Sequence, residues 1–348
     1  VNVLLVNAFA SLATGGAVIT GQYLGRREVG KAGHSAQQLL LFMAEVSLAV
    51  MVLFYLGKGF VLNVVFGQVE ADVAAYANTY YMIVEASIPF LALYSAGAAL
   101  FRVMGNSGTS MWVSTAMNAI NVVGNGLLIF VFHRGVEGVA IPTLVSRIFA
   151  AAAMLVLLRR PNLPIQVERF TFRHDRFVVK NILHFGVPNG IEGSMFQLGK
   201  ILLLSTVSVL GTAAVAANAI GNTLASFQVV PGTALGLAIV TVVSRCVGAS
   251  EYDRARYYTK KMMRTAYLYT VLVIALILAC LPLILKLYNV SDQAREWATQ
   301  ILWMHGLCGI LIWPLAFTLP QALRAAGDTR FTMVASTVSM WTLRVGLG

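Results

Sequence analysis

The sequence predicts an all-α polytopic membrane protein, and the prediction rests on its composition, its apolar stretches and an internal repeat. Of the 348 residues, 58% are hydrophobic and 11% are charged, with a mean hydropathy of +0.76. A soluble domain carries roughly 25% charged residues, so this chain has too little charge to coat a soluble globule. Most of its apolar surface must therefore face lipid.

Apolar stretches long enough to cross a bilayer follow one another along the chain. A crossing of ~30 Å of hydrocarbon needs ~20 mostly apolar helical residues, and ten stretches qualify, the last cut short by the chain end. They are Val3–Tyr23, Ala36–Leu56, Ala74–Phe101, Ser110–Phe132, Gly138–Leu158, Ile182–Leu210, Ala214–Val243, Thr265–Leu287, Trp297–Leu323 and Phe331–Gly348.

The placement of Lys and Arg predicts the orientation of these stretches. The connections after the first, third, fifth, seventh and ninth stretches hold 18 basic residues, and the other connections hold four. Basic residues gather in cytoplasmic connections, so we expect the odd-numbered exits to face the cytoplasm. The net charge of +11 is then mainly a signal of topology and does not indicate nucleic-acid binding.

The longest polar connection, Arg159–Lys180, divides the chain. It contains Pro161, Pro164 and a run of basic residues but few apolar ones, which is typical of a tether between larger parts. We therefore predict an N-lobe over residues 1–158, a basic cytoplasmic linker over 159–181 and a C-lobe over 182–348.

Two pairs of connections repeat at nearly one offset. Gly21–Ala32 aligns with Ser244–Ala255 at an offset of 223, and Leu100–Met111 aligns with Ala322–Met333 at an offset of 222. Because both copies lie on the predicted cytoplasmic side, each repeat must hold an even number of spans, and six fit ~222 residues. Two six-helix lobes of the same orientation are related by a pseudo-two-fold axis along the membrane normal. On this prediction the first repeat lacks its opening helix and the second stops inside its fifth.

On these motifs the chain resembles the multidrug and toxic compound extrusion (MATE) transporters, twelve-helix antiporters built from two six-helix lobes. The segment Gly186–Glu192, which opens the second lobe, adds to the resemblance. It implies a secondary antiporter that exports amphipathic or cationic drugs and toxic compounds in exchange for Na⁺ or H⁺. It further implies a monomer in the bacterial inner membrane, with small-molecule substrates, the lipid bilayer as its surroundings, no nucleic-acid partner, no cofactor and no enzymatic activity. On this resemblance, we expect the sequence to begin at the family's second helix, after the first helix where the proton-coupled branch keeps an N-lobe carboxylate.

Six ionisable residues inside the predicted spans are candidates for function, because such groups are costly in a membrane and usually face a protein interior or a water-filled cavity. Glu192 is the first choice for ion coupling because it follows Pro188, which frees a backbone carbonyl, and because the family commonly carries an essential carboxylate on this helix. The alternative is a structural partner for an Arg or Lys. The other candidates are Glu85 and Glu45 for coupling, and Arg147, Lys200 and His305 for the cavity.

Contacts among these six can be predicted only in part. Lys200 lies ~12 Å along the helix from Glu192 and is rotated by ~80°, so the two should not pair directly. Arg147 is balanced by Glu45, by Glu85 or by neither. His305 either shuttles protons or is simply hydrogen-bonded.

Polar and soft side chains mark candidate cavity walls. Asn118, Asn121 and Asn125 share one helix face and must turn inward, where they either hydrogen-bond other helices or line a polar cavity. Asn218 and Asn222 form a shorter version of this stripe. Met195, Phe196 and Gln197 either contact a flat cation or pack between helices.

Two other functions remain open. A flippase for lipid-linked precursors, known among related two-lobe folds, would need a basic cavity lined by Arg147 and Lys200. A membrane protein without transport activity is the third possibility. The sequence has no HExxH, GxSxG or Walker-type motif, and it predicts no metal site beyond Na⁺ at Glu192.

Overall fold

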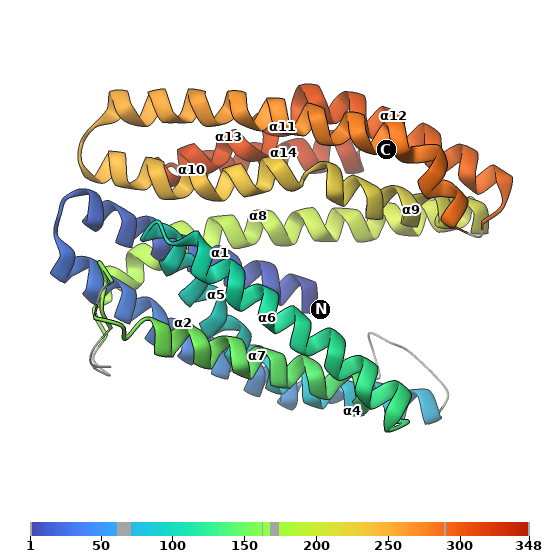
Figure 1. Ribbon diagram of the computed structural model, residues 1–348, viewed down its shortest axis with the longest axis horizontal. Helices are drawn as coiled ribbons and strands as arrows, with labels where there is room; N and C mark the ends of the chain where they lie inside the picture. The colour runs from blue at the N-terminus through green and yellow to red at the C-terminus, as the bar shows by residue number, and fades with distance from the viewer. Residues whose placement is uncertain (1, 61–70, 162, 168–173, 289, 347–348) are drawn as a thin grey trace. The chain divides into compact units, whose positions relative to one another are not determined.

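The structure is all-helical, as the sequence predicts (Figure 1). This computed structural model describes residues 2–60, 71–161, 163–167, 174–288 and 290–346, and every regular element among them is a helix. The chain forms two compact units, Val1–Gly190 and Ile191–Gly348. The division falls inside one long helix, α8 (Arg176–Val209).

Unit 1 is built around α5. This helix packs against α1, α2 and α7, while α7 also packs against α4 and α6. Most of α5 is buried, and the small residues on it let its neighbours approach closely. The helices of unit 1 before α8 are α1 (Asn2–Gly25), α2 (Val29–Leu56), α3 (Lys58–Phe60), α4 (Ala71–Ala86), α5 (Ile88–Val103), α6 (Ser107–Gly126) with the π-helical turn η2 (Leu127–Val131), and α7 (Glu137–Leu157).

Unit 2 has two apolar cores joined by its longest helix. One core lies among α9, α11 and α12, and the other among α10, α11 and α13. Besides the end of α8, the helices are α9 (Thr212–Gln228), α10 (Val230–Gly248), α11 (Tyr252–Leu287), α12 (Asp292–Trp313) with the π-helical turn η3 (Pro314–Thr318), α13 (Leu319–Ala326), and α14 (Thr329–Ser339) with the π-helical turn η4 (Met340–Val345).

The described residues contain eight helical stretches long and apolar enough to cross a membrane, two fewer than the ten predicted. The stretch predicted at Ile182–Leu210 is helical, as part of α8, but polar residues such as Glu192 and Lys200 lower its apolarity. The stretch predicted at Phe331–Gly348 is described as the short helix α14 and the turn η4.

Two predicted spans are broken in the middle. Ala74–Phe101 becomes α4 and α5, separated at Ser87, and Ala214–Val243 becomes α9 and α10, separated at Val229. In each case a proline, Pro89 or Pro231, stands in the first turn of the second helix. Proline fits a first helical turn because its missing N–H has no partner there, so these breaks have a local cause.

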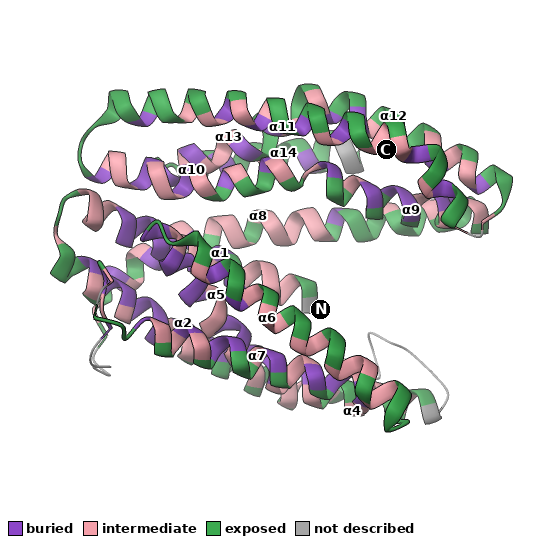
Figure 2. Cartoon of the chain, viewed as in Figure 1, coloured by how far each residue is buried: buried purple, intermediate pink, exposed green. Residues whose placement is uncertain are grey.

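Many large apolar side chains are exposed in both units. Figure 2 colours exposed residues green along the helices of both units. Leu56 is 79% exposed, Val209 85% and Leu287 82%. A soluble protein rarely exposes so many large apolar side chains together, whereas a bilayer accepts them and requires the backbone groups to be satisfied inside helices. These surfaces are therefore suited to lipid.

The connection predicted as a linker packs on unit 1 where it is described. Ile165 and Val167 are buried in the core of unit 1. Before α8, the backbone N–H of Asp175 donates to Gln38 Oε1 of α2 at 3.0 Å. Residues 162 and 168–173 of this predicted linker lie outside the described residues.

The first repeated connection has one backbone conformation in both units. Arg27 and Ser250, which the offset of 223 aligns, adopt positive φ values of 60° and 61°. The next residues, Glu28 and Glu251, have φ and ψ of −89° and 67°, and −90° and 66°. Glu28 pairs with Lys31 at 3.0 Å and Glu251 pairs with Arg254 at 2.8 Å.

The second repeated connection also matches. Gly105 and Gly327, aligned by the offset of 222, have positive φ values of 87° and 116°, a conformation that favours glycine. Each is followed by an N-cap residue: Asn106 Oδ1 accepts from the N–H of Thr109 at 3.3 Å, and Asp328 Oδ1 accepts from that of Phe331 at 3.1 Å. The atomic detail of both turns therefore agrees with the duplication that the sequence predicts.

Candidate functional site

Among the described residues of unit 2, the shortest and least exposed ion pair joins Glu192 of α8 to Arg324 of α13. Arg324 Nη2 donates to Glu192 Oε2 at 2.6 Å, and the two side chains are only 9% and 15% exposed, respectively. Arg324 Nε also donates to Thr332 Oγ1 of α14 at 3.4 Å. A charge-assisted hydrogen bond of this length with little solvent is among the stronger polar contacts in a protein.

Local sequence explains why these two groups meet. Glu192 stands one turn after Pro188 within α8, where proline removes one backbone hydrogen bond. Arg324 occupies the last turn of α13, just before Gly327 and the capping residue Asp328 reverse the chain into α14. The sequence pattern placed Arg324 in a cytoplasmic connection, but the residue is 7% exposed and lies inside the helix.

Aromatic side chains surround the next turns of α8. Phe196 lies edge-on to Phe317 with ring centroids 5.7 Å apart, and Phe317 stacks on Trp313 at 5.1 Å. Lys200 is exposed, and its ammonium lies 5.3 Å from the centroid of the Phe196 ring. The partner of Glu192 is Arg324, as in the structural alternative for this residue, and the predicted absence of a direct pair with Lys200 agrees with this contact. Met195 and Gln197 are half-buried beside Phe196.

His305 of α12 is hydrogen-bonded to a residue that the sequence analysis overlooked. Its Nδ1 lies 2.6 Å from Oε1 of Gln228, a fully buried residue at the end of α9. The Nε2 of Gln228 has no hydrogen-bond partner among the described residues. Its position could have identified Gln228 as a candidate site residue, because it is a polar residue directly before the α9–α10 break.

The asparagine stripe of α6 is only partly turned inward. Asn121 Nδ2 donates to Thr143 Oγ1 of α7 at 3.1 Å, and Asn125 Nδ2 donates to Asn121 Oδ1 at 3.2 Å. Asn118 is exposed. Of the described residues, none donates to the buried Asn125 Oδ1, so this cluster keeps one carbonyl oxygen for another donor or cation.

The shorter stripe of α9 has the same internal bond. Asn222 Nδ2 donates to Asn218 Oδ1 at 3.1 Å, with Asn222 exposed and Asn218 half-buried. This contact satisfies the pair within one helix and presents the remaining amide groups outward.

In unit 1, Arg147 contacts a serine, Glu45 contacts a histidine, and Glu85 is buried. Arg147 Nη1 of α7 donates to Ser87 Oγ at 2.6 Å, so a hydroxyl group overlooked by the sequence analysis receives this guanidinium. Glu85 is buried at 4% exposure. Glu45 is exposed and pairs with His174 at 3.0 Å, so the contact weighed between Glu45 and Arg147 is replaced by one with a histidine.

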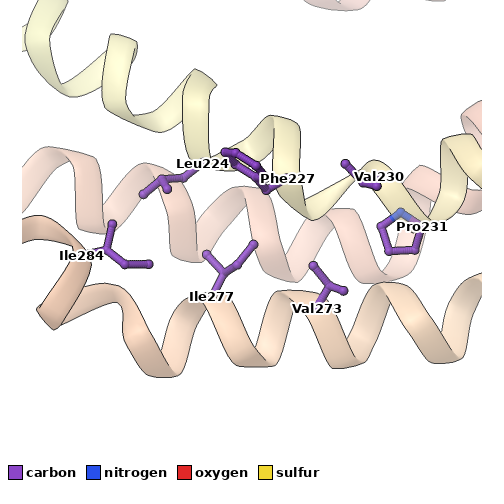
Figure 3. Close-up of a pocket in the computed structure, with 7 residues that line it drawn as sticks. All are labelled: Leu224, Phe227, Val230, Pro231, Val273, Ile277 and Ile284. Carbon is purple, nitrogen blue, oxygen red and sulfur yellow. The ribbon is translucent and has the colours of Figure 1, made fainter. Parts of the chain in front are cut away.

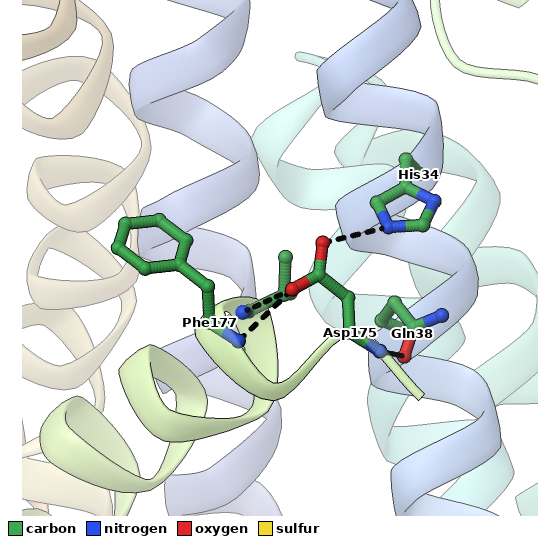
Figure 4. A network of polar contacts seen from close by, with 5 residues as sticks. His34, Gln38, Asp175 and Phe177 are labelled. Atoms are coloured by element: carbon green, nitrogen blue, oxygen red, sulfur yellow. Dashed lines mark hydrogen bonds and ion pairs between the residues drawn. The ribbon is translucent and has the colours of Figure 1, made fainter. Parts of the chain in front are cut away.

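A polar network holds the start of α8 onto α2 (Figure 4). Asp175 Oδ1 accepts from the N–H groups of Phe177 and Val178 at 2.9 and 3.3 Å, and its Oδ2 lies 3.1 Å from His34 Nε2. Burial raises the pKa of Asp175, but these hydrogen bonds and the nearby His34 outweigh it, and the pKa lies below its ordinary value. Asp175 therefore acts as the N-cap of α8.

An apolar hollow of about 440 Å³ lies beside the α9–α10 break in unit 2 (Figure 3). None of the predicted site residues lines it. Its walls come from the end of α9, the start of α10 and the facing side of α11, and the residues are Leu224, Phe227, Val230, Pro231, Val273, Ile277 and Ile284. Such a wall accepts hydrocarbon and offers no polar contact.

The described residues hold no group of three or more His, Cys, Asp or Glu side chains arranged to bind a metal ion. The polar groups available for a functional site are therefore buried charged side chains with their partners, and amide side chains, on helices that suit a membrane.

Known proteins share this sequence and fold. The MatE family model matches residues 1–127 and 188–348. The chain is 27% identical over 353 residues to the probable multidrug resistance protein YoeA of Bacillus subtilis, covering 98% of this chain and 75% of that protein. It is 24% identical over 289 residues to the probable multidrug resistance protein NorM of Thermotoga maritima, covering 82% and 62%.

Solved structures agree with the fold. The outward-facing conformation of a multidrug resistance MATE family transporter of the MOP superfamily superposes with a TM-score of 0.92 at 16% identity, covering 99% of this chain and 76% of that one. A MOP superfamily transporter from Pyrococcus furiosus gives 0.87 at 16% identity, covering 99% and 76%. Since the family model matches most of the sequence and these structures share the two-lobe fold, the chain belongs to the MATE family of multi-pass membrane transporters.

Proposed function

We propose that this chain is a secondary active antiporter that exports amphipathic or cationic drugs and toxic compounds in exchange for Na⁺ or H⁺. In this proposal it works as a monomer in the bacterial inner membrane and needs no cofactor. The observation that carries the proposal is the buried ion pair between Glu192 and Arg324. The names of relatives such as YoeA, a probable multidrug resistance protein, support the class of substrate.

The Glu192 carboxylate is suited to coupling because its charge is already balanced by a group that can be displaced. A proton or Na⁺ that reaches Glu192 competes with the Arg324 guanidinium for the same oxygen. The displaced guanidinium keeps its second contact, to Thr332 of α14. Ion binding therefore changes the contact between α8 and the α13–α14 turn.

Coupling requires that the ion binds the two conformations of the transporter with different affinity. The competition with Arg324 supplies such a difference if the Glu192–Arg324 distance changes between the conformations. Where the pair is intact, the carboxylate is occupied and ion affinity is low. Where the pair is open, the carboxylate is free for the ion and affinity is high.

Amide groups of unit 1 and aromatic rings of unit 2 each offer chemistry that suits the proposed substrate. Within unit 1, the α6 cluster offers Asn125 Oδ1, to which none of the described residues donates. Within unit 2, Phe196 presents a ring that already lies near a cationic group, the Lys200 ammonium. Amide oxygens and ring faces attract organic cations. This chemistry supports an amphipathic or cationic compound.

The flippase alternative has less support. It requires Arg147 to face an anionic head group, yet Arg147 donates to Ser87 between packed helices of unit 1. Lys200 is exposed and fits either function. The antiporter therefore remains the proposal.

The test replaces Glu192 by Gln in the full-length protein reconstituted in vesicles. We expect ion-driven efflux of a fluorescent organic cation to fall to the background rate, because glutamine retains the shape but cannot bind a proton or balance Na⁺. Asp292→Asn is the control, since the Asp292 side chain is 99% exposed, and it should leave efflux unchanged. Unchanged efflux in the Glu192→Gln protein would remove Glu192 from the mechanism.

A further inference from the structure

Glu85 is a second buried carboxylate, and one of its oxygens is unsatisfied. It lies in the last turn of α4 and is 4% exposed. Of the described residues, none forms a hydrogen bond with its buried Oε2 atom. An ionised carboxylate is costly to bury, by several kcal/mol even after the protein relaxes, and an unmade hydrogen bond adds to that cost. The position therefore favours a carboxyl group that is neutralised in at least one state of the protein.

The neighbouring positive charge is Arg147 of α7, a helix packed against α4. Its Nη1 donates to Ser87 Oγ at 2.6 Å, two residues after Glu85, and the Ser87 hydroxyl donates in turn to the Val84 carbonyl. Arg147 and Glu85 also interact electrostatically. The guanidinium thus donates to a neutral hydroxyl, while the Oε2 atom of Glu85, two residues from that hydroxyl along the chain, has no hydrogen-bond partner among the described residues.

Two tyrosines also face Glu85, but their hydroxyl protons are in use. Tyr55 of α2 donates to the Met82 carbonyl at 2.9 Å, and Tyr81 of α4 donates to the Phe54 carbonyl at 3.1 Å. Both rings lie near enough to act on Glu85 electrostatically. Neither phenol therefore satisfies the carboxyl oxygen.

The other described neighbours add little charge. On α5, the remaining helix packed on α4, the single charged side chain is Arg102, which lies at the far end from the α4–α5 break. Tyr80 of α4 faces Arg147. Among the side chains of the described residues, Arg147 is accordingly the positive charge that acts on Glu85.

A proton fits this place better than a metal cation. A metal cation would need several oxygen ligands around it and would be repelled by the Arg147 guanidinium. A proton binds to the carboxyl oxygen itself, needs no ligand shell and removes the charge that is costly to bury. Binding and release are simple: the proton joins Glu85 Oε2 to give the neutral acid and leaves to restore the carboxylate.

We propose that Glu85 is a proton-binding site of unit 1 and that Arg147 responds to its charge. With Glu85 protonated, Arg147 stays on Ser87, as in this structure. With Glu85 ionised, the guanidinium moves from Ser87 to the carboxylate. Because Ser87 is the residue between α4 and α5, this exchange changes the contact of α7 with the break in the helix. The inference rests on the proposed antiporter and adds to it a proton site distinct from Glu192.

The direct test is infrared difference spectroscopy of the full-length protein in lipid, recorded over a pH titration. A protonated carboxyl group gives a carbonyl stretching band that an ionised one lacks. We expect one titrating band to disappear in Glu85→Gln and to remain in Glu45→Gln, the matched control, since Glu45 is exposed and pairs with His174. A band unchanged in Glu85→Gln would overturn the proposal.

Two further variants test the role of Arg147 and keep the Glu85 side chain. Arg147→Gln removes the positive charge, so the midpoint of the band should move to higher pH by about one unit or more. Ser87→Ala removes an acceptor that competes with the carboxylate for Arg147, so the midpoint should move to lower pH. Midpoints that fail to move in opposite directions would refute the exchange.

These results separate the two proposals. If Glu85 titrates as described but the protein moves no compound in vesicles, the antiporter proposal is refuted and the proton-site proposal stands. If the protein shows ion-driven efflux but no titrating band from Glu85, the proton-site proposal is refuted and the antiporter proposal stands.

Discussion

Replacing either partner of the Glu192–Arg324 pair should destabilise the protein far more than replacing both. Arg324→Met leaves the Glu192 carboxylate 15% exposed without its guanidinium, and removing one partner of a buried pair costs ~3–5 kcal/mol. Glu192→Gln leaves the Arg324 charge, which keeps its hydrogen bond to Thr332 at 3.4 Å. The double variant buries neither charge, so the two losses should not add.

The coupling energy follows from a double-mutant cycle. We expect ~1.5–3 kcal/mol, the range for hydrogen bonds to charged groups and for residues in direct contact. The assay is reversible unfolding of the four proteins in mixed micelles by increasing anionic detergent, followed by far-ultraviolet circular dichroism.

A second ion pair in the same unit provides the control. Glu251 and Arg254 are 2.8 Å apart, but their side chains are 42% and 69% exposed, and exposed pairs contribute ~0–1 kcal/mol. The cycle for this pair should therefore give a small coupling energy. If the Glu192–Arg324 coupling is no larger than this control, the reasoning that the buried pair is strong fails.

Two further predictions concern unit 1 and can be read in the same unfolding assay. Asp175→Ala should cost ~0.5–2 kcal/mol at pH 7, the value of a helix N-cap. The folded-state pKa of Asp175 is lowered, so its contribution to stability is complete above the unfolded-state pKa of ~3.9 and is lost as the pH falls through the folded-state pKa. The unfolding free energies of the Asp175→Ala variant and the parent protein should therefore converge in acid. A difference in unfolding free energy that stays constant with pH would contradict this prediction. Gly15→Ala should cost ~1–3 kcal/mol by overpacking, because the new Cβ would lie 2.8 Å from the backbone nitrogen of Gly186. Gly30→Ala is the control, since a Cβ there meets nothing within 4 Å, and it should be neutral or stabilising. Equal effects of Gly15→Ala and Gly30→Ala on the unfolding free energy would show that the close approach of α1 and α8 is absent.

The sequence predicted the fold class and the repeated turns because both depend on local patterns. Apolar stretches and sparse charge are enough to predict membrane helices, and the Gly327-Asp328 sequence is enough to predict a positive-φ residue followed by a helix N-cap. These features need no knowledge of which helices touch.

The pairing of charges could not be predicted in the same way. Arg324 was assigned to a cytoplasmic connection because hydropathy marks only the approximate end of a helix, and the last turn of α13 buries it against Glu192. Likewise the break at Ser87 falls within a continuous apolar run, so the hydroxyl that receives Arg147 was not distinguished from a packing residue. Both contacts depend on tertiary packing between helices far apart in the sequence.

The matching turns at Arg27 and Ser250 carry an engineering consequence. Two different side chains occupy the same left-handed backbone conformation, which disfavours residues with a Cβ by roughly 1–2 kcal/mol. Both turns carry this strain, so relieving it in either turn should stabilise the protein. Because the geometry is shared, the segments 22–31 and 245–254 should be interchangeable by transplantation, and a glycine that relaxes one turn should relax the other equally.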